Sequence, residues 1–224
     1  MSHSIARPET IVIRTLQPMT ILGESATGTW ADLDIVTDRH GLPYIPRSRL
    51  NARLRASAVR AVRALHEKDS DLLDAMLDLM GAHGDHPDRP RLVQVDHARF
   101  DDDARRMVAM TVATFGDDLA TVRDFVSSVT DSVTTVLTQT AVARTRAPKT
   151  GSLRSLRTLR EGTTLVAPLL WARAPEEKHV RALALAVLGI GQLGAGEGNQ
   201  GRVSVSLDGD TASTITSATS EVSQ

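Results

Sequence analysis

The order of strand and helix patterns along the chain restricts the folds that it can adopt. Alternating or β-branched residues predict four core strands, at residues 9–16, 91–100, 164–171 and 202–207. Apolar residues at helical spacing predict three core helices, over residues 48–65, 69–82 and 175–188. With the consecutive helices 48–65 and 69–82 counted as one helical unit, these segments follow the order strand, helix, strand, strand, helix, strand. That order predicts an α+β fold with a ferredoxin-like (RRM-like) βαββαβ core.

A long segment separates the second and third predicted strands. It forms an insertion at about residues 101–150, and the mixed periodicity of residues 103–136 predicts that it is partly helical. The helical pattern breaks over residues 138–151, at Pro148 and Gly151. We expect one domain over residues 1–207. Residues 208–224 are rich in Ser and Thr and carry almost no apolar anchor, so we expect a disordered tail there.

Prolines restrict two further segments. Pro43 and Pro46 exclude a helix over residues 41–46, because proline disfavours helical conformation in the residue before it. Ser48 then supplies a suitable N-cap for the first core helix. Pro168 implies that the third strand lies at a sheet edge or contains a bulge, because proline cannot donate a ladder hydrogen bond.

The composition excludes several classes of site. The chain has no cysteine, which excludes a disulfide scaffold, thiolate-bound zinc or iron–sulfur sites, and a cysteine nucleophile. No apolar run approaches the roughly 20 residues that span a bilayer. Residues 1–14 lack the apolar core of a signal peptide. We therefore expect a cytoplasmic protein with no membrane partner.

The net charge is −1, but the charges are segregated along the chain. Residues 47–63 contain six arginines and no acid, and residues 144–160 contain five arginines, one lysine and no acid. Such segregation permits binding to a polyanion without a net positive charge. Guanidinium groups suit phosphate because their planar fork donates two hydrogen bonds at once. Together the windows favour a phosphate backbone over the alternative of solvated helix faces or salt bridges.

Five sequence blocks, in order, resemble the RAMP superfamily of repeat-associated RNA-binding subunits of CRISPR effector complexes. They are a Gly/Ser loop with an acidic segment at 23–38, a proline stretch with a helix start at 41–55, a strand at 91–100, a thumb segment with its following strand at 138–171, and a glycine-rich loop with the last strand at 189–207. The chain looks most similar to the backbone subunits of type III complexes, and its thumb segment resembles that of type III-D subunits.

The resemblance implies that the chain binds guide RNA and target RNA, beside other CRISPR effector subunits and copies of itself along the guide. The implied RNA-binding residues on the first core helix are Arg47, Ser48, Arg49, Asn51, Arg53 and Arg55. Those near the thumb are Arg144, Arg146, Lys149 and Arg154. Those in the glycine-rich loop are Gly196, Gly198 and Gly201, where the main chain would approach RNA closely.

The resemblance also implies that an aspartate promotes metal-assisted cutting of target RNA. Asp32, Asp34 and Asp38 share one side of an extended segment, where carboxylates can hold Mg²⁺ or Mn²⁺. Asp32 is the better match to the catalytic, metal-binding aspartate, and Asp34 is the alternative. Residues 31–38 equally fit a solvated acidic edge strand or loop.

Three other functions stay open. A non-cutting architectural subunit of the same complex would keep the fold and lose the cleavage. A guide-processing endoribonuclease would depend on histidine. A ferredoxin-like oligomerisation module would have no link to RNA.

Overall fold

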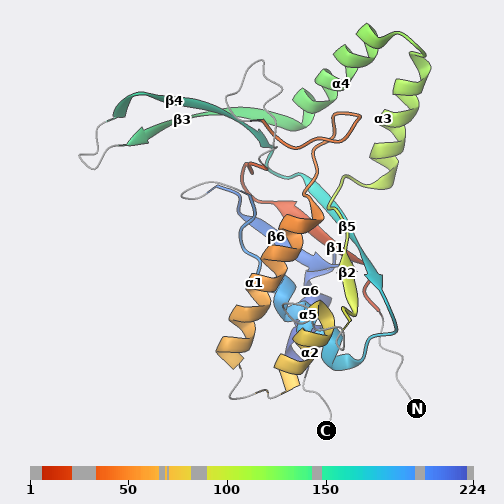
Figure 1. The fold of residues 1–224 in the computed structure, drawn as a ribbon, viewed down its shortest axis with the longest axis vertical. Helices are drawn as coiled ribbons and strands as arrows, with labels where there is room; N and C mark the ends of the chain where they lie inside the picture. Colours follow the sequence, from red (N-terminus) through yellow and green to blue (C-terminus); the bar gives the residue numbers. More distant parts are fainter. Residues whose placement is uncertain are drawn as a thin grey trace.

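The computed structural model describes residues 7–21, 34–65, 69, 71–81, 90–142, 148–194 and 200–220. In these residues the chain forms an α+β fold around an antiparallel four-stranded sheet with the strand order β2-β5-β1-β6 (Figure 1). The four strands are β1 (Thr10–Thr15), β2 (Val93–Val95), β5 (Thr164–Trp171) and β6 (Val203–Leu207).

One face of this sheet is buried because apolar residues alternate along its strands. In β1, Ile11 and Ile13 are fully buried, and in β5, Leu165 and Ala167 are fully buried. The register pairs Ile11 with Ala167 and Ile13 with Leu165, so these side chains lie side by side on one face. On the other face Leu170 is 54 % exposed. The period of two therefore directs one set of side chains into the core.

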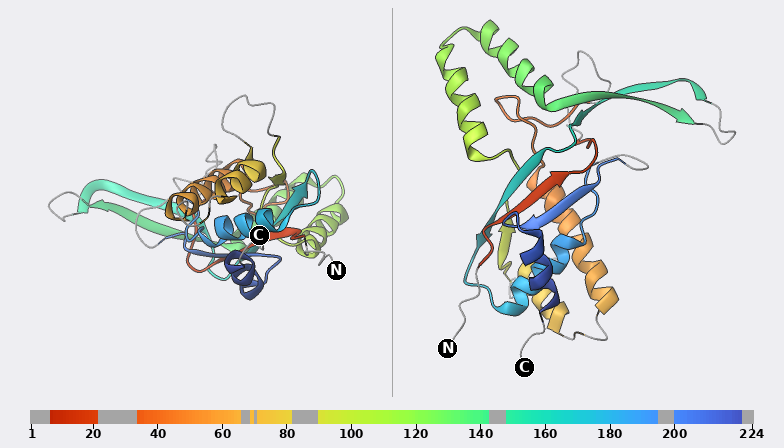
Figure 2. Two further views of the ribbon diagram at one scale, coloured as in Figure 1. Left: turned by 90° about the horizontal axis from the view of Figure 1, so that it is seen from below. Right: turned by 180° about the vertical axis from the view of Figure 1, so that it is seen from behind.

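Four helices contribute to the same hydrophobic core. They are α1 (Arg47–Leu65), α2 (Asp71–Met80), α5 (Glu177–Leu188) and α6 (Thr211–Thr219). Helix α5 contacts the other three, and it lies among them in the view from below (Figure 2). Its Ala182, Ala184 and Ala186 are fully buried. Their small side chains let the neighbouring helices approach closely. No helix in the described residues is both long and apolar enough to cross a bilayer.

The insertion between β2 and β5 stands away from that core except at Leu159, the last residue of β4, which is buried in it (Figure 1). It consists of α3 (Asp102–Thr114), α4 (Leu119–Val133), β3 (Thr134–Val142) and β4 (Pro148–Leu159). Helix α3 buries no residue, and α4 buries only Val129. The rings of Phe115 and Phe125 pack edge to face, with centroids 5.4 Å apart, where the two helices join. Strands β3 and β4 form a long antiparallel hairpin that projects from the molecule (Figure 2).

Two predictions for the insertion need correction. The helical pattern expected to about residue 136 ends at Val133, and residues 134–142 form β3. The segment expected only to break the helix, residues 138–151, belongs largely to the β3–β4 hairpin. The β-branched residues of Thr134–Val142 favour a strand, and the pairing of Thr134 with Leu159 begins the ladder directly after α4.

The expected disorder of the C-terminal tail is wrong for residues 211–219, which form α6. The Asp210 carboxylate caps the helix by accepting the Ser213 N–H at 2.9 Å. Thr214 is buried, and its hydroxyl accepts the Leu207 N–H at 2.9 Å. Buried Ala218 joins the hydrophobic core. A cap and two small buried residues therefore order a segment with few apolar side chains.

Pro168 lies inside the sheet, because β5 pairs with β1 on one side and β2 on the other. The edge-strand alternative is therefore wrong. Between the pairs Val95–Leu169 and Arg99–Val166, the chain following β2 advances four residues while β5 advances three. Pro168 lies within this irregular stretch, which matches the bulge alternative.

Candidate nucleic-acid interface

Hydrogen bonds to the Pro46 carbonyl and to the His97 side chain fix the start of α1. The Pro46 carbonyl accepts the N–H groups of Arg49 at 3.0 Å and Leu50 at 3.1 Å, so the helix begins directly after the proline stretch. The Arg47 N–H donates to Nδ1 of His97 at 3.1 Å. Buried Leu50 anchors the first turn in the core. The predicted RNA-binding residues of this window therefore stand on a rigid helix end.

Three arginines near the start of α1, Arg47, Arg49 and Arg53, are exposed, and together we call them the α1 basic edge. The first turn of α1 carries no acid, and Ser48 is exposed beside the arginines. Positive side chains oppose the helix macrodipole at an N-terminus, whereas a bound anion is favoured both by the arginines and by the helix end. The α1 basic edge is therefore suited electrostatically to phosphate.

The α1 basic edge borders the glycine-rich segment. Arg49 and Arg53, one helical turn apart, line a hollow of about 300 Å³ together with Leu193 and Gly194. Gly194 has φ +89°, and a Cβ there would lie 2.4 Å from the Thr20 carbonyl oxygen. The two sequence-predicted regions thus meet in space, and the close backbone packing requires glycine at this position.

The backbone conformation and packing at position 201 also require glycine. Its φ is +74°, and a Cβ there would lie 2.1 Å from the Leu193 carbonyl oxygen. Its carbonyl accepts the Leu193 N–H at 2.9 Å. Gly196 and Gly198 lie outside the described residues. Contact of this loop with RNA stays a prediction.

Asn51 and Arg55 bind backbone carbonyls of neighbouring elements. The Asn51 side-chain amide donates to the Arg47 carbonyl at 2.7 Å and to the Val95 carbonyl at 3.1 Å. Arg55 Nη2 donates to the Met80 carbonyl at 2.7 Å, at the end of α2. These contacts give both side chains a role in joining α1 to β2 and α2. Their contact with RNA stays a prediction.

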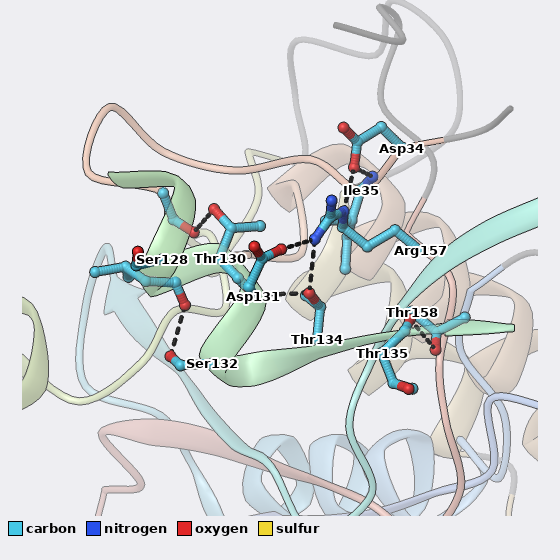
Figure 3. Close-up of polar contacts among 12 residues, drawn as sticks. Asp34, Ile35, Ser128, Thr130, Asp131, Ser132, Thr134, Thr135, Arg157 and Thr158 are labelled. Carbon is cyan, nitrogen blue, oxygen red and sulfur yellow. Dashed lines mark hydrogen bonds and ion pairs between the residues drawn. The ribbon is translucent and has the colours of Figure 1, made fainter. Parts of the chain in front are cut away.

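The basic residues of the second window, residues 144–160, differ in what the structure shows of them. Arg144 and Arg146 lie outside the described residues, and Lys149 and Arg154 belong to β4. Arg157, which is 11 % exposed, lies between Asp34 and Asp131 (Figure 3). Its Nε is 3.2 Å from the Asp34 carboxylate, and its Nη1 forms an ion pair with Asp131. The same Nη1 donates to the Thr134 hydroxyl at 3.2 Å. Arg157 therefore clamps the base of the hairpin.

The acidic segment does not form a metal site in the described residues. Asp32 lies outside them. The Asp34 carboxylate accepts the Ile35 N–H at 2.8 Å besides binding Arg157. Asp38 closes a turn by accepting the N–H groups of His40 at 2.9 Å and Leu42 at 3.1 Å. The described residues contain no group of three or more His, Asp or Glu side chains arranged to hold a metal ion. The Asp34 and Asp38 carboxylates thus have partners within the chain, and binding of Mg²⁺ or Mn²⁺, with Asp32 as the expected ligand, stays a prediction.

The structure brings together an aromatic and basic cluster that the sequence analysis missed. The rings of Tyr44 and His97 pack edge to face with centroids 5.1 Å apart. The Arg99 guanidinium carbon lies 5.8 Å from the Tyr44 ring centroid. The proline stretch and the residues after β2 meet through the bridge between Ile45 and Ala98. Each segment was predicted to be extended, but no local pattern reveals that the two pair.

Burial lowers the pKa of His97 below its usual value of 6.5. The nearby charges of Arg99 and Arg47 lower this pKa further, whereas Asp96 acts in the opposite direction. The lowered pKa favours a neutral imidazole. A neutral ring leaves Nδ1 free to accept the Arg47 N–H, so His97 holds the first residue of α1.

Comparison with solved structures extends over nearly the whole chain. A chain in the cryo-EM structure of the type III-B Cmr-beta bound to cognate target RNA matches with a TM-score of 0.59 and 12 % identity, covering 90 % of this chain and 97 % of that one. A chain in the apo-state structure of the type III-B Cmr-beta matches with a TM-score of 0.59 and 13 % identity, covering 92 % and 99 %. The likeness is one of fold. No family model and no curated protein matches the sequence.

Proposed function

We propose that the chain is a RAMP-type subunit that binds guide RNA within a multi-subunit, RNA-targeting type III CRISPR effector complex. The α1 basic edge carries this proposal, because arginines stand where a helix N-terminus ordinarily favours acids. A phosphate backbone resolves that conflict by binding both the guanidinium groups and the helix end. The proposed partners are guide RNA, target RNA, other effector subunits and further copies of this chain.

The fold supports the same proposal. One of the matched structures is described as bound to cognate target RNA, and its chain is covered almost completely. The four strands of the βαββαβ sequence lie in the order β2-β5-β1-β6 in the sheet. This arrangement supports our proposal that the sheet is a ferredoxin-like core. Both matched structures are of type III-B, so they lend no support to the type III-D-like features expected from the thumb segment.

For target cleavage we propose Asp32 in preference to Asp34. The ion pair with Arg157 and the Ile35 N–H occupy the Asp34 carboxylate, which supports a positioning role for that residue. In the assembled complex, Asp32→Ala is expected to abolish target cleavage at unchanged guide content, and Asp34→Asn is expected to retain cleavage. Retained cleavage with Asp32→Ala would favour the non-cutting architectural subunit.

Nucleic acid that copurifies with the protein tests the guide-binding proposal. The full chain is purified at moderate salt from cells that express its complex, and the bound nucleic acid is extracted and sequenced. We expect short RNAs of repeat–spacer type. Recovery of random cellular RNA, or of protein free of nucleic acid from an intact complex, would contradict the proposal.

A further inference from the structure

A second basic surface lies between the turn at residues 38–41 and the start of α3. We call it the α3 pocket. It encloses about 630 Å³ and is lined by the side chains of Arg39, His40, Arg99, Arg105 and Arg106, together with Asp38 and Asp102. Its size falls within the range of ordinary ligand sites. Four arginines against two carboxylates make its lining positive, and the pairing of Arg106 with Asp103 at 3.4 Å is between exposed side chains.

The acids of the α3 pocket are already bound within the chain. The Asp38 carboxylate accepts two backbone N–H groups of its own turn. Asp102 pairs with Arg105 at 2.9 Å, but the Asp102 side chain is 83 % exposed. Exposed ion pairs of this kind contribute little free energy, so an incoming phosphate can compete for the arginine. The carboxylates therefore leave the pocket attractive to anions.

Arg99 is the most distinctive residue of the α3 pocket. Its backbone exchanges hydrogen bonds with Val166 at 2.9 Å and 2.7 Å, which fixes its position beside β5. Its Nε is buried, and no group in the described residues accepts its hydrogen bond. Its guanidinium also lies over the Tyr44 ring. A buried N–H without an acceptor is costly, and a bound phosphate oxygen would supply the acceptor.

The wall opposite α3 is fixed before any ligand binds. Gly41 has φ +83°, and a Cβ there would lie 2.4 Å from the Val126 carbonyl oxygen. The Thr130 hydroxyl donates to the Gly41 carbonyl at 2.8 Å, which ties the turn to α4. At the other wall, the Asp101 carboxylate caps α3 by accepting the Ala104 N–H at 2.8 Å. A preformed pocket loses little conformational freedom on binding.

We propose that the α3 pocket binds a phosphodiester segment of single-stranded RNA, as a site separate from the α1 basic edge. Arg39 and Arg99 contact the phosphates in this proposal. The Tyr44 and His97 rings connect the pocket to Arg47, so one strand can pass from one site to the other. The proposal rests on the proposed function for RNA as the ligand; the preference for an anion rests on the pocket alone.

The test compares two variants of the full chain that each lose two positive charges. Arg39→Ala/Arg99→Ala changes the α3 pocket. Arg123→Ala/Arg173→Ala removes two exposed arginines of other surfaces and is the matched control. The affinity for a labelled single-stranded RNA oligonucleotide is measured by fluorescence anisotropy at several salt concentrations. We expect the pocket variant to bind about tenfold more weakly and to lose about 1.4 from its salt slope, because each phosphate contact on a single strand contributes about 0.7. An unchanged Kd and slope would overturn the proposal.

Two further arms keep the outcomes distinct. Arg99→Lys retains the charge and loses the planar fork, so we expect binding between that of the wild type and that of the double variant. If inorganic phosphate or a mononucleotide competes as well as the oligonucleotide does, the pocket is a small-anion site and the RNA assignment is wrong.

Weak binding confined to Arg49→Ala/Arg53→Ala would leave the proposed function standing and reject the α3 pocket. Weak binding confined to the pocket variant would support the α3 pocket and would reject the α1 basic edge, the observation that carries the proposed function. Absence of RNA binding by the wild type would overturn both.

Discussion

The two arginine-rich windows have the same number of basic residues and no acid but differ in what their side chains contact. In residues 47–63, Arg49 and Arg53 are exposed on the first turns of α1. In residues 144–160, Arg157 binds Asp34 and Asp131. Near it, Arg160 donates from Nε to the Thr134 carbonyl at 2.8 Å and from Nη2 to the Asp131 carbonyl at 3.2 Å. Arg49 and Arg53 of the first window present charge to solvent, whereas Arg157 and Arg160 of the second hold the insertion together.

Whether an arginine lies at the C-terminus or at the N-terminus of a helix determines which partner it has. Arg160 lies at the C-terminus of α4, where carbonyl groups lack partners within the helix. Arg55 reaches the C-terminal carbonyls of α2, and Arg60 donates to the Gly189 carbonyl at 3.0 Å at the end of α5. These carbonyls carry partial negative charge and attract guanidinium groups. The arginines of the α1 basic edge lie at a helix N-terminus, where an external anion is the complementary partner.

The largest expected effect is on stability, at the base of the hairpin. Arg157→Ala leaves Asp34 and Asp131 without their shared cation, so we expect a loss of about 2–3 kcal/mol in the free energy of unfolding. Urea denaturation measures this loss. Arg123→Ala, an exposed arginine on α4, should change stability by less than about 0.5 kcal/mol. If both variants unfold at the same urea concentration, Arg157 is not a structural clamp.

The next effect is on RNA binding, at the α1 basic edge. Arg49→Ala/Arg53→Ala removes two proposed phosphate contacts, so we expect about tenfold weaker binding and a salt slope lower by about 1.4. The free energy of unfolding should stay constant or rise by about 0.3–1 kcal/mol, because positive charge at a helix N-terminus is unfavourable. Salt-dependent anisotropy and urea denaturation of the same samples measure both. A loss of stability with unchanged RNA affinity would reverse the distinction between the windows.

A smaller effect is expected within the first window itself. Arg55→Ala removes charge-assisted hydrogen bonds to the end of α2, so we expect a loss of about 1 kcal/mol in stability. RNA affinity should fall less than twofold, although Arg55 is only two residues from Arg53. Comparison of the two alanine variants by urea denaturation and RNA titration checks this. A tenfold loss of affinity with Arg55→Ala would extend the α1 basic edge to this residue.

Local signals explain the parts of the fold that the sequence predicts. Strand β1 alternates, α5 has a continuous apolar face, and the proline stretch directly precedes α1. Helix α6 and the β3–β4 hairpin were not predicted because their order depends on distant contacts. Ala218 of α6, for example, is buried in a core formed by strands and helices from much earlier in the chain. The Arg157 clamp likewise depends on Asp34, which is remote in sequence.

Dependence on contacts that are distant in the sequence also limits prediction of the site. Charge segregation identifies the arginines, since it is visible in a single window of sequence. It does not reveal which of them meet a carbonyl group from another element. Arg55 and Met80 are 25 residues apart, and Arg60 and Gly189 are 129 residues apart. The α3 pocket is invisible for a related reason, because Arg39, Arg99 and Arg105 come from three separate segments.

The smallest expected effect is the pH response of His97, which links the α1 basic edge to the α3 pocket. Its folded pKa lies below the unfolded value of 6.5, so the unfolded chain binds more protons near that pH. The stability that the neutral ring contributes is therefore present above pH 6.5 and is lost as the pH falls through the folded pKa. An NMR titration of the His97 ring measures the folded pKa, and a value at or above 6.5 would contradict this account. Bound phosphates favour the charged ring, so RNA should raise this pKa. The rise should be smaller in Arg49→Ala/Arg53→Ala at the same RNA concentration, because less RNA is bound next to His97.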